Sequence, residues 1–210
     1  MTKTRVSISI DSEILSKLDR QVDNVTILSR SEAIEKIIDK HVSKNKKCVI
    51  LAGGQLESIY VKDSKIFKPL VNLANNLTLI EDMIQKVSKA GYQHVFIVGP
   101  REVLSEIYKI VGEGKELHIE YIEEKETLGS AKTLAHIRDH VKSHFLFMPC
   151  DHYFELDLEA LEKFHKINKG TVTLAVYSGR KYAWDKSSIV DMEGNLITNY
   201  EEEPKENKTF

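Results

Sequence analysis

The sequence contains few cysteines and no long apolar segment, and both absences narrow the class of protein. Its two cysteines, Cys48 and Cys150, lack the CxxC spacing of zinc clusters and redox pairs, and they indicate no disulfide framework. No apolar run approaches the roughly 18 residues that a membrane span needs. The amino terminus also lacks the apolar core of a signal peptide. We therefore expect a cytoplasmic protein that has no membrane partner.

The chain also has little net charge, but this charge is distributed unevenly. The formal net charge is −2. Residues 1–47 contain ten Lys/Arg and seven Asp/Glu, giving +3, whereas residues 48–210 contain twenty and twenty-five, giving −5. A basic segment joined to an acidic one indicates different partners for the two parts, although +3 also fits a solvated surface. The charged joint "KNKK" at 44–47 places a domain boundary after residue 47.

The first 47 residues have the pattern of one strand followed by two helices. In "TRVSISI", residues 4–10, apolar and polar side chains alternate, which predicts a half-buried strand. Apolar side chains then recur at helical spacing over residues 11–22, behind Asp11 or Ser12 as the N-cap. A second apolar stripe follows in "SRSEAIEKIIDKHV", for which we expect Ser31 to be the N-cap.

A unit of one strand and two helices is too small to enclose its own core. Two copies would solve this problem by pairing their strands antiparallel and interlocking four helices. The exposed face of the resulting ribbon would carry Arg5, Ser7 and Ser9, and a two-stranded ribbon fits the major groove of DNA. The free N–H groups at the start of the second helix, around Ser29 to Ser31, would suit a phosphate.

Residues 3–43 resemble the ribbon-helix-helix family of dimeric DNA-binding repressors, including its typical "SRSEAI" segment. The glycine that is common before "SRS" is absent here, because the chain has "TIL". The resemblance implies a homodimer, or a higher even-numbered oligomer, that binds double-stranded DNA. The alternative is that the segment only dimerises the protein. The implied base contacts are Arg5, Ser7 and Ser9, and the implied backbone contacts are Ser29, Arg30 and Ser31.

Residues 48–210 alternate apolar strand segments with amphipathic helical segments. Strands are predicted at 48–52, 94–99, 117–124, 144–151 and 171–178, helices at 77–91, 101–114, 128–141 and 156–168, and a hairpin at 187–204. This alternation predicts a Rossmann-like, mostly parallel α/β/α domain. Such sheets bind ligands at the carboxyl ends of their strands, and both Gly53-Gly54 and Asp151 follow predicted strands.

The same residues resemble the sugar-nucleotide pyrophosphorylases, which join a sugar 1-phosphate to a nucleoside triphosphate. The matching motifs are "LAGG" at 51–54, "KPL" at 68–70, "EKETLGSAKTL" from residue 124, "FLFMPCD" at 145–151 and "YEEEP" at 200–204. The resemblance implies a nucleotide or sugar-nucleotide ligand and Mg²⁺ held by Asp151. The implied nucleotide-binding residues are Leu51, Ala52, Gly53, Gly54, Lys68, Glu124, Gly129 and Ser130.

Three positions depart from the motifs of this family. Leu56 replaces a glycine, Ser58 replaces an arginine and Glu203 replaces a lysine that meets the sugar phosphate. Loss of one charge-stabilising donor typically costs ~2.7–4 kcal/mol of barrier, so two losses argue against ordinary turnover. The relatives also continue beyond the position of Phe210. We therefore assign no catalytic residue and leave enzymatic activity open.

Single residues near these motifs have simpler explanations that remain open. Asp151 would serve equally as a cap for the following helix, and Lys68 as a solvated surface lysine. His152 has the residue type of a metal ligand, but a lone histidine is usually structural. We expect Cys150 to be a buried strand thiol. The run "EEEPKE" at 201–206 is most simply a solvated acidic surface.

These patterns leave three functional hypotheses. The one that we favour from sequence is a dimeric DNA-binding transcriptional regulator whose degenerate nucleotidyltransferase-like domain binds a nucleotide or sugar nucleotide. The alternative is an active sugar-phosphate nucleotidyltransferase that is dimerised by its N-terminal segment. The third is a scaffold in which neither site functions.

Overall fold

The computed structural model describes residues 4–23, 25–44, 46–54, 59–114, 117–125, 129–177, 188–202 and 204. The chain divides into two compact units, Met1–Ala160 and Leu161–Phe210. The first unit contains a pair of helices and a four-stranded sheet, and the second contains a two-stranded hairpin. None of the helices in these described ranges is long and apolar enough to cross a membrane.

The helix pair consists of α1 (Ser12–Asp19) and α2 (Arg30–Lys44). The Asp11 carboxylate accepts the first free N–H groups of α1, which confirms the predicted N-cap. At α2 the prediction of Ser31 as the cap is wrong. The Ser29 hydroxyl accepts the N–H of Glu32 at 3.2 Å, and the Ser29 carbonyl accepts that of Ala33, so the first turn begins before Ser31.

A small contact holds the two helices together. Leu18 and Ala33 are buried, and Arg30 forms a two-pronged ion pair with Asp19 at 2.5 and 2.8 Å. The hydrogen bonds from Arg30 hold the pKa of Asp19 below its usual value. Because this ion pair is exposed to solvent, it stabilises the helix pair only weakly.

The predicted strand at residues 4–10 does not form in the single chain. Those residues have no strand assignment, and the side chains of Val6 and Ile8 are 75% and 58% exposed. A strand requires a partner for its backbone N–H and C=O groups, and none of the described residues of this chain pairs with 4–10. The half-buried alternation therefore has no sheet beneath it within one chain.

The sheet of the first unit is entirely parallel. It consists of β1 (Lys47–Leu51), β2 (His94–Gly99), β3 (His118–Glu123) and β4 (Phe145–Pro149) in the order β3-β2-β1-β4. The predicted α/β class is therefore confirmed, together with the four strands that build this sheet. β1 and β2 are the two inner strands, and after their first residues, Lys47 and His94, their side chains are apolar and largely buried.

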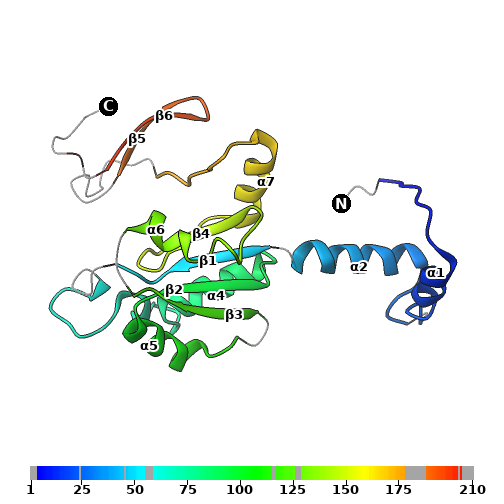
Figure 1. The fold of residues 1–210 in the computed structure, drawn as a ribbon, viewed down its shortest axis with the longest axis horizontal. Helices are drawn as coiled ribbons and strands as arrows, with labels where there is room; N and C mark the ends of the chain where they lie inside the picture. The colour runs from blue at the N-terminus through cyan, green and yellow to red at the C-terminus, as the bar shows by residue number, and fades with distance from the viewer. Residues whose placement is uncertain are drawn as a thin grey trace. The chain divides into compact units, whose positions relative to one another are not determined.

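Helices cover both faces of this sheet (Figure 1). On one face, α4 (Leu79–Lys89) and α5 (Arg101–Val111) pack their apolar stripes against Cys48, Ile50, Val95 and Ile97. On the other face, α6 (Ser130–Ala135) and the turn after it cover Val49, Phe96 and Val98. α6 is shorter than the helix predicted over 128–141, because hydrogen-bonded turns follow it up to residue 140.

The boundary between the two units falls within α7 (Leu158–Asn168), and the second unit begins at Leu161. Its hairpin pairs β5 (Ile189–Glu193) with β6 (Leu196–Glu201), which confirms the predicted hairpin. The strand predicted at 171–178 is wrong for the part that the structure describes, because residues 171–177 contain no strand. Their β-branched side chains favour a strand but supply no pairing partner.

Candidate functional site

The carboxyl ends of β1 and β4 lie side by side, because the two strands are neighbours in the sheet. Leu51 is paired with Pro149, and the Cys150 N–H donates to the Leu51 carbonyl at 2.8 Å. β1 continues into Gly53 and Gly54, and β4 continues into Asp151. The glycine pair and the aspartate, which are nearly a hundred positions apart in the sequence, therefore lie at one sheet edge, as the strand pattern predicts.

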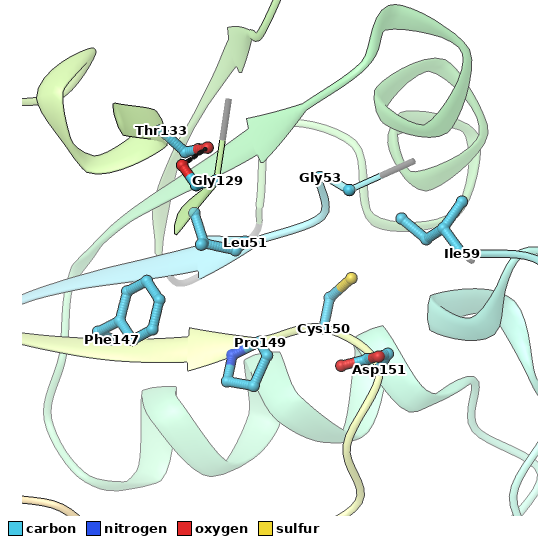
Figure 2. A pocket seen from close by; sticks show the side chains of 10 residues that line it. Leu51, Gly53, Ile59, Gly129, Thr133, Phe147, Pro149, Cys150 and Asp151 are labelled. Carbon is cyan, nitrogen blue, oxygen red and sulfur yellow. Dashed lines mark hydrogen bonds between the residues drawn. The ribbon is translucent and has the colours of Figure 1, made fainter. Parts of the chain in front are cut away.

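A cavity of about 320 Å³ lies at this edge (Figure 2). Four predicted nucleotide-binding residues line it together with Asp151. The lining residues are Leu51, Gly53, Gly54, Ile59, Gly129, Thr133, Phe147, Pro149, Cys150 and Asp151. A cavity of this size is at the lower end of the range for small-molecule sites.

The other predicted nucleotide-binding residues surround the cavity without lining it. Ala52 is fully buried, and Glu124 is 5% exposed and lies behind Gly53. Lys68 begins the short 3₁₀ helix η1 (Lys68–Leu70) and contacts Asp151. Ser130 is the first residue of α6, and its side chain lies outside the described part of the chain.

Sequence reasoning did not assign five of the lining residues to the site, and one of these, Cys150, was expected only as a buried strand thiol. Phe147 and Pro149 could have been predicted, because they precede Asp151 by four and two positions and alternate side chains of a strand share a face. Thr133 could also have been predicted, since it follows Gly129 by one helical turn. Nothing in the sequence pattern marks Ile59.

The structure explains why positions 53 and 54 carry glycine. Gly54 has φ of 127°, in the region that side chains disfavour. A Cβ on Gly53 would collide with the Glu124 carboxylate, whose other oxygen accepts a hydrogen bond from the Thr133 hydroxyl. The second oxygen, Oε2, is buried and has no hydrogen-bond partner among the described residues. Position 53 therefore has room only for glycine while the Glu124 carboxylate lies behind it.

Asp151 is bracketed by two basic side chains. The His152 Nδ1 lies 2.6 Å from Oδ1, and the Lys68 ammonium lies 3.4 Å from Oδ2. The hydrogen bond from His152 lowers the pKa of Asp151, and the same contact raises the pKa of His152. Asp151 is therefore an anion at neutral pH, and Lys68, whose side chain is 36% exposed, is paired with it.

The alternative of Asp151 as a helix cap is wrong. The next helix, α7, begins at Leu158, and its first turn is capped by Asp157, whose carboxylate accepts the Ala160 N–H at 2.9 Å. Cys150 is 2% exposed, which confirms the prediction of a buried thiol, and burial raises its pKa to about 12. Cys150 is therefore not a nucleophile at neutral pH.

Lys86 of α4 anchors the segment that follows Asp151. Its ammonium donates to the Phe154 carbonyl at 2.6 Å, pairs with Asp82 at 2.6 Å, and lies 4.3 Å from the centre of the Tyr153 ring. Three partners on one ammonium fix residues 153 and 154, and therefore also the direction in which the chain leaves Asp151.

We expect Lys86→Met to destabilise the protein, because it removes these bonds and leaves Asp82 with one fewer partner. The loss of ~1–3 kcal/mol corresponds to a fall in Tm of ~2–10 °C. Lys89→Met is the matched control, since Lys89 is an exposed residue of the same helix. Equal Tm values for the two variants, measured by thermal denaturation, would show that Lys86 does not anchor this segment.

Comparison with known proteins identifies the larger part of the chain. Residues 47–209 match the family model described as nucleotidyl transferase. The chain belongs to the nucleotidyl transferase family. A glucose-1-phosphate adenylyltransferase from Clostridioides difficile (strain 630) is 25% identical over 190 residues, which cover 80% of this chain and 48% of that protein. The chain thus spans about half the length of this relative.

Two solved structures share the fold. A protein from Bacillus anthracis, named as a candidate glucose-1-phosphate thymidylyltransferase and crystallised with sucrose, has a TM-score of 0.61 and 18% identity, covering 77% of this chain and 65% of that chain. The UTP-bound UGPase from Acinetobacter baumannii has a TM-score of 0.60 and 15% identity, covering 76% of this chain and 68% of that chain. At these identities the likeness concerns the fold alone.

Neither the structure nor the family match tests two sets of predictions, namely the departures from the family motifs and the function of the N-terminal segment. Leu56, Ser58 and Glu203, where the chain departs from the family motifs, fall outside the described residues, as does half of the acidic run at 201–206. The nucleotidyl transferase match begins at residue 47 and leaves the N-terminal segment unassigned.

The predicted DNA contacts are all exposed in the single chain, but they are not equally available. Arg5, Ser7 and Ser9 lie in the segment before α1, and their side chains form no hydrogen bond or ion pair with the part of the chain that the structure describes. The Ser29 hydroxyl already caps α2, and the Arg30 guanidinium already binds Asp19. Ser31 lies in the first turn of α2.

Proposed function

We propose that this chain is a sugar-phosphate nucleotidyltransferase that binds a nucleoside triphosphate in the cavity at the ends of β1 and β4. The observation that carries this proposal is the convergence of Gly53, Gly54, Lys68 and Asp151 at one sheet edge. A flexible glycine pair, an ammonium and a carboxylate are the groups that bind a metal-complexed triphosphate.

The proposed reaction is a displacement at phosphorus. A phosphate oxygen of the sugar 1-phosphate forms a bond to the α-phosphorus of the triphosphate, and the bond from that phosphorus to the pyrophosphate oxygen breaks. Negative charge accumulates on the leaving pyrophosphate. Gly53 and Gly54 allow the backbone to approach the phosphates, and the Lys68 ammonium supplies positive charge beside them.

The residues present fit a magnesium ion. Asp151 is an ionised hard-oxygen ligand at the wall of the cavity, with a third of its side chain exposed. Magnesium commonly uses one or two carboxylates and completes its shell with water and substrate phosphates. When bound, the ion would neutralise charge on the phosphate oxygens. Asp151 is the residue that we propose as its ligand.

The departures from the family motifs set the expected rate. Leu56, Ser58 and Glu203 remove a glycine and two cations from the implied phosphate and sugar-phosphate contacts. Each missing cation is expected to slow turnover by ~100-fold or more, so we expect a slow enzyme rather than an inactive one. We expect Lys68, and Asp151 through a bound magnesium ion, to preserve ligand binding.

Ligand binding can be tested before turnover. Calorimetry with ATP, dTTP, UTP, GTP and CTP, each with and without magnesium, should show saturable binding of at least one triphosphate that magnesium strengthens. Lys68→Met should weaken this binding, and Lys65→Met is a matched control because Lys65 is exposed and lies three residues before Lys68. Absence of binding for all five triphosphates would contradict the proposal.

The N-terminal segment favours a second, separate function. Its apolar side chains are exposed in the single chain: Val6 75%, Ile8 58%, Ile14 59%, Leu28 65% and Ile38 54%. Apolar exposure on this scale in 40 residues indicates a protein interface. A second copy of the segment would supply both the missing strand partner and cover for these side chains. We propose that the resulting dimer binds DNA through Arg5, Ser7 and Ser9.

Oligomeric state and DNA binding test this second function separately. Light scattering should give a dimer for the wild-type chain and a monomer for Val6→Asp/Ile8→Asp. In a mobility shift with the DNA upstream of the protein's own coding sequence, Arg5→Ala should weaken binding by ~10-fold or more, whereas Arg20→Ala should not. A monomeric wild-type chain would contradict both claims, and a dimer that shifts no DNA would restrict the segment to dimerisation.

A further inference from the structure

Three histidines and a glutamate cluster at the amino-terminal edge of the sheet. His94 is the first residue of β2, His118 is the first residue of β3, and the two are paired in the sheet. Glu120 lies on β3 two residues after His118, so the two side chains share a face. His140 reaches this face from the turns that follow α6. Chain segments that are distant in the sequence thus contribute to one group.

All three histidines contact the same carboxylate. The Nε2 atoms of His94 and His118 lie 2.6 and 3.2 Å from Glu120 Oε1, and His140 Nδ1 lies 3.6 Å from Glu120 Oε2. The ligand atoms of His94, His118 and Glu120 all lie within 4.8 Å of one another. The rings of His94 and His118 meet edge to face, with centroids 4.6 Å apart.

These separations match the ligand spacing of a tetrahedral metal ion. Bonds of ~2.0–2.1 Å to zinc place neighbouring tetrahedral ligand atoms ~3.3 Å apart. The three observed contacts to Glu120, between 2.6 and 3.6 Å, bracket that value. An ion held by His94, His118 and Glu120 would therefore need only small side-chain movements, whereas His140, which approaches the other oxygen of Glu120, would have to move closer. The exposed rings of His118 and His140 leave the ion a path from solvent.

We propose that His94, His118, Glu120 and His140 form a binding site for a zinc-class divalent ion. Imidazole and carboxylate suit zinc, cobalt and nickel, whereas magnesium prefers an all-oxygen shell. The ammonium of Lys47 donates to the His140 carbonyl at 2.5 Å, and no ion pair joins it to Glu120 in the described part of the chain. The packing of His94 on Phe96, with ring centroids 4.6 Å apart, orients one ligand in advance.

The site is distinct from the proposed nucleotide cavity and does not depend on nucleotidyl transfer. β2 has six residues, so its two ends are ~16 Å apart, and the cavity lies at the carboxyl edge of the sheet. Four protein ligands would fill a tetrahedral shell, which is typical of a structural rather than a catalytic ion. Such an ion would tie β2 and β3 to the turns that follow α6.

Cobalt is the probe that tests this site. The full chain, free of any affinity tag and stripped of metal with EDTA, should bind one equivalent of Co²⁺ with the visible absorption of tetrahedral coordination. Zinc should displace the cobalt, and a large excess of magnesium should not. His118→Asn and His140→Asn should each weaken binding by at least the ~10–100-fold that loss of an outer-shell partner costs.

Two controls separate this site from other histidines and from the cavity. His136→Asn changes an exposed histidine one turn before His140, and Asp151→Asn changes the carboxylate beside His152; both should leave cobalt binding unchanged. Zinc should also raise the Tm of the wild type but not that of His118→Asn. Absence of stoichiometric cobalt binding, unchanged binding in His118→Asn/Glu120→Gln, or its loss in Asp151→Asn would overturn the proposal.

Discussion

Asp151→Asn should reduce the rate of pyrophosphate release by ~100-fold or more, because it removes the anionic ligand that we propose for the metal. The asparagine side chain is nearly isosteric, so the cavity keeps its shape. It also keeps an oxygen for His152 but loses the charge that pairs with Lys68. The expected effect is therefore on rate and on the magnesium requirement rather than on folding. Coupled detection of pyrophosphate over a magnesium series would measure both.

Asp157→Asn provides the control for this variant. Asp157 is exposed, lies six residues further along and caps α7 with the same chemical group. Asparagine caps helices about as well as aspartate, so this variant should keep the wild-type rate and Tm. If both variants lost activity equally, or if Asp151→Asn kept the wild-type rate and magnesium dependence, Asp151 would not be the metal ligand.

Gly53→Ala should destabilise the protein and weaken nucleotide binding together. The added methyl would meet the buried Glu124 carboxylate, which has little room to withdraw because Thr133 holds its other oxygen. Overpacking of this kind costs ~1–3 kcal/mol, which corresponds to a fall in Tm of ~2–10 °C. Gly170→Ala is the matched control, since a Cβ there would approach its nearest neighbour at 3.4 Å, an ordinary contact.

Glu124→Ala should rescue the stability of Gly53→Ala. This change removes the group that the added methyl strikes, and the Thr133 hydroxyl keeps a second acceptor, the Gly129 carbonyl at 3.2 Å. A double-mutant cycle on Tm or on the free energy of unfolding would measure the coupling between the two positions. Additive effects would show that the two side chains do not collide, and that Gly53 is required for another reason.

The strands of the sheet and the edge that carries the site could be predicted from sequence because both depend on local patterns. After Lys47 and His94, β1 and β2 are continuous apolar runs, which is typical of parallel strands that are buried on both faces. β4 is also a continuous apolar run, although Phe145 and Phe147 are 39% and 38% exposed. Each of these strands is followed by a change to glycine or to a polar residue, and this marks the carboxyl edge of the sheet. From these two patterns alone, Gly53 and Asp151 are expected at the same edge, where the structure places them.

The incorrect strand predictions concern segments whose structure depends on a distant partner. Residues 4–10 and 171–177 have the side-chain alternation of strands, but alternation supplies no hydrogen-bond partner. Ile59 reaches the cavity because of the tertiary path of the chain, and the collision of Gly53 with Glu124 joins residues that are distant in the sequence. Contacts of this kind leave no periodic signal in a single sequence.

The preference between the two main hypotheses also changes with these findings. The sequence favoured a DNA-binding regulator because the residues of the predicted DNA-facing ribbon fit that role and two cations are missing from the catalytic motifs. The family match over residues 47–209 and the cavity that contains Asp151 support the nucleotidyltransferase more strongly. Regulation through DNA remains a proposal for the N-terminal segment alone, and the two functions are compatible within one chain.

Single-turnover nucleotidyl transfer is the most direct test of the proposed activity. The full chain, in excess over a triphosphate labelled at the α-phosphate, is incubated with magnesium and glucose 1-phosphate, and the products are separated over hours. Excess enzyme reveals a single turnover even when missing cations make the reaction slow. We predict a labelled nucleoside diphosphate sugar formed together with one equivalent of pyrophosphate. A triphosphate that binds but stays intact with this and other hexose 1-phosphates would contradict the account.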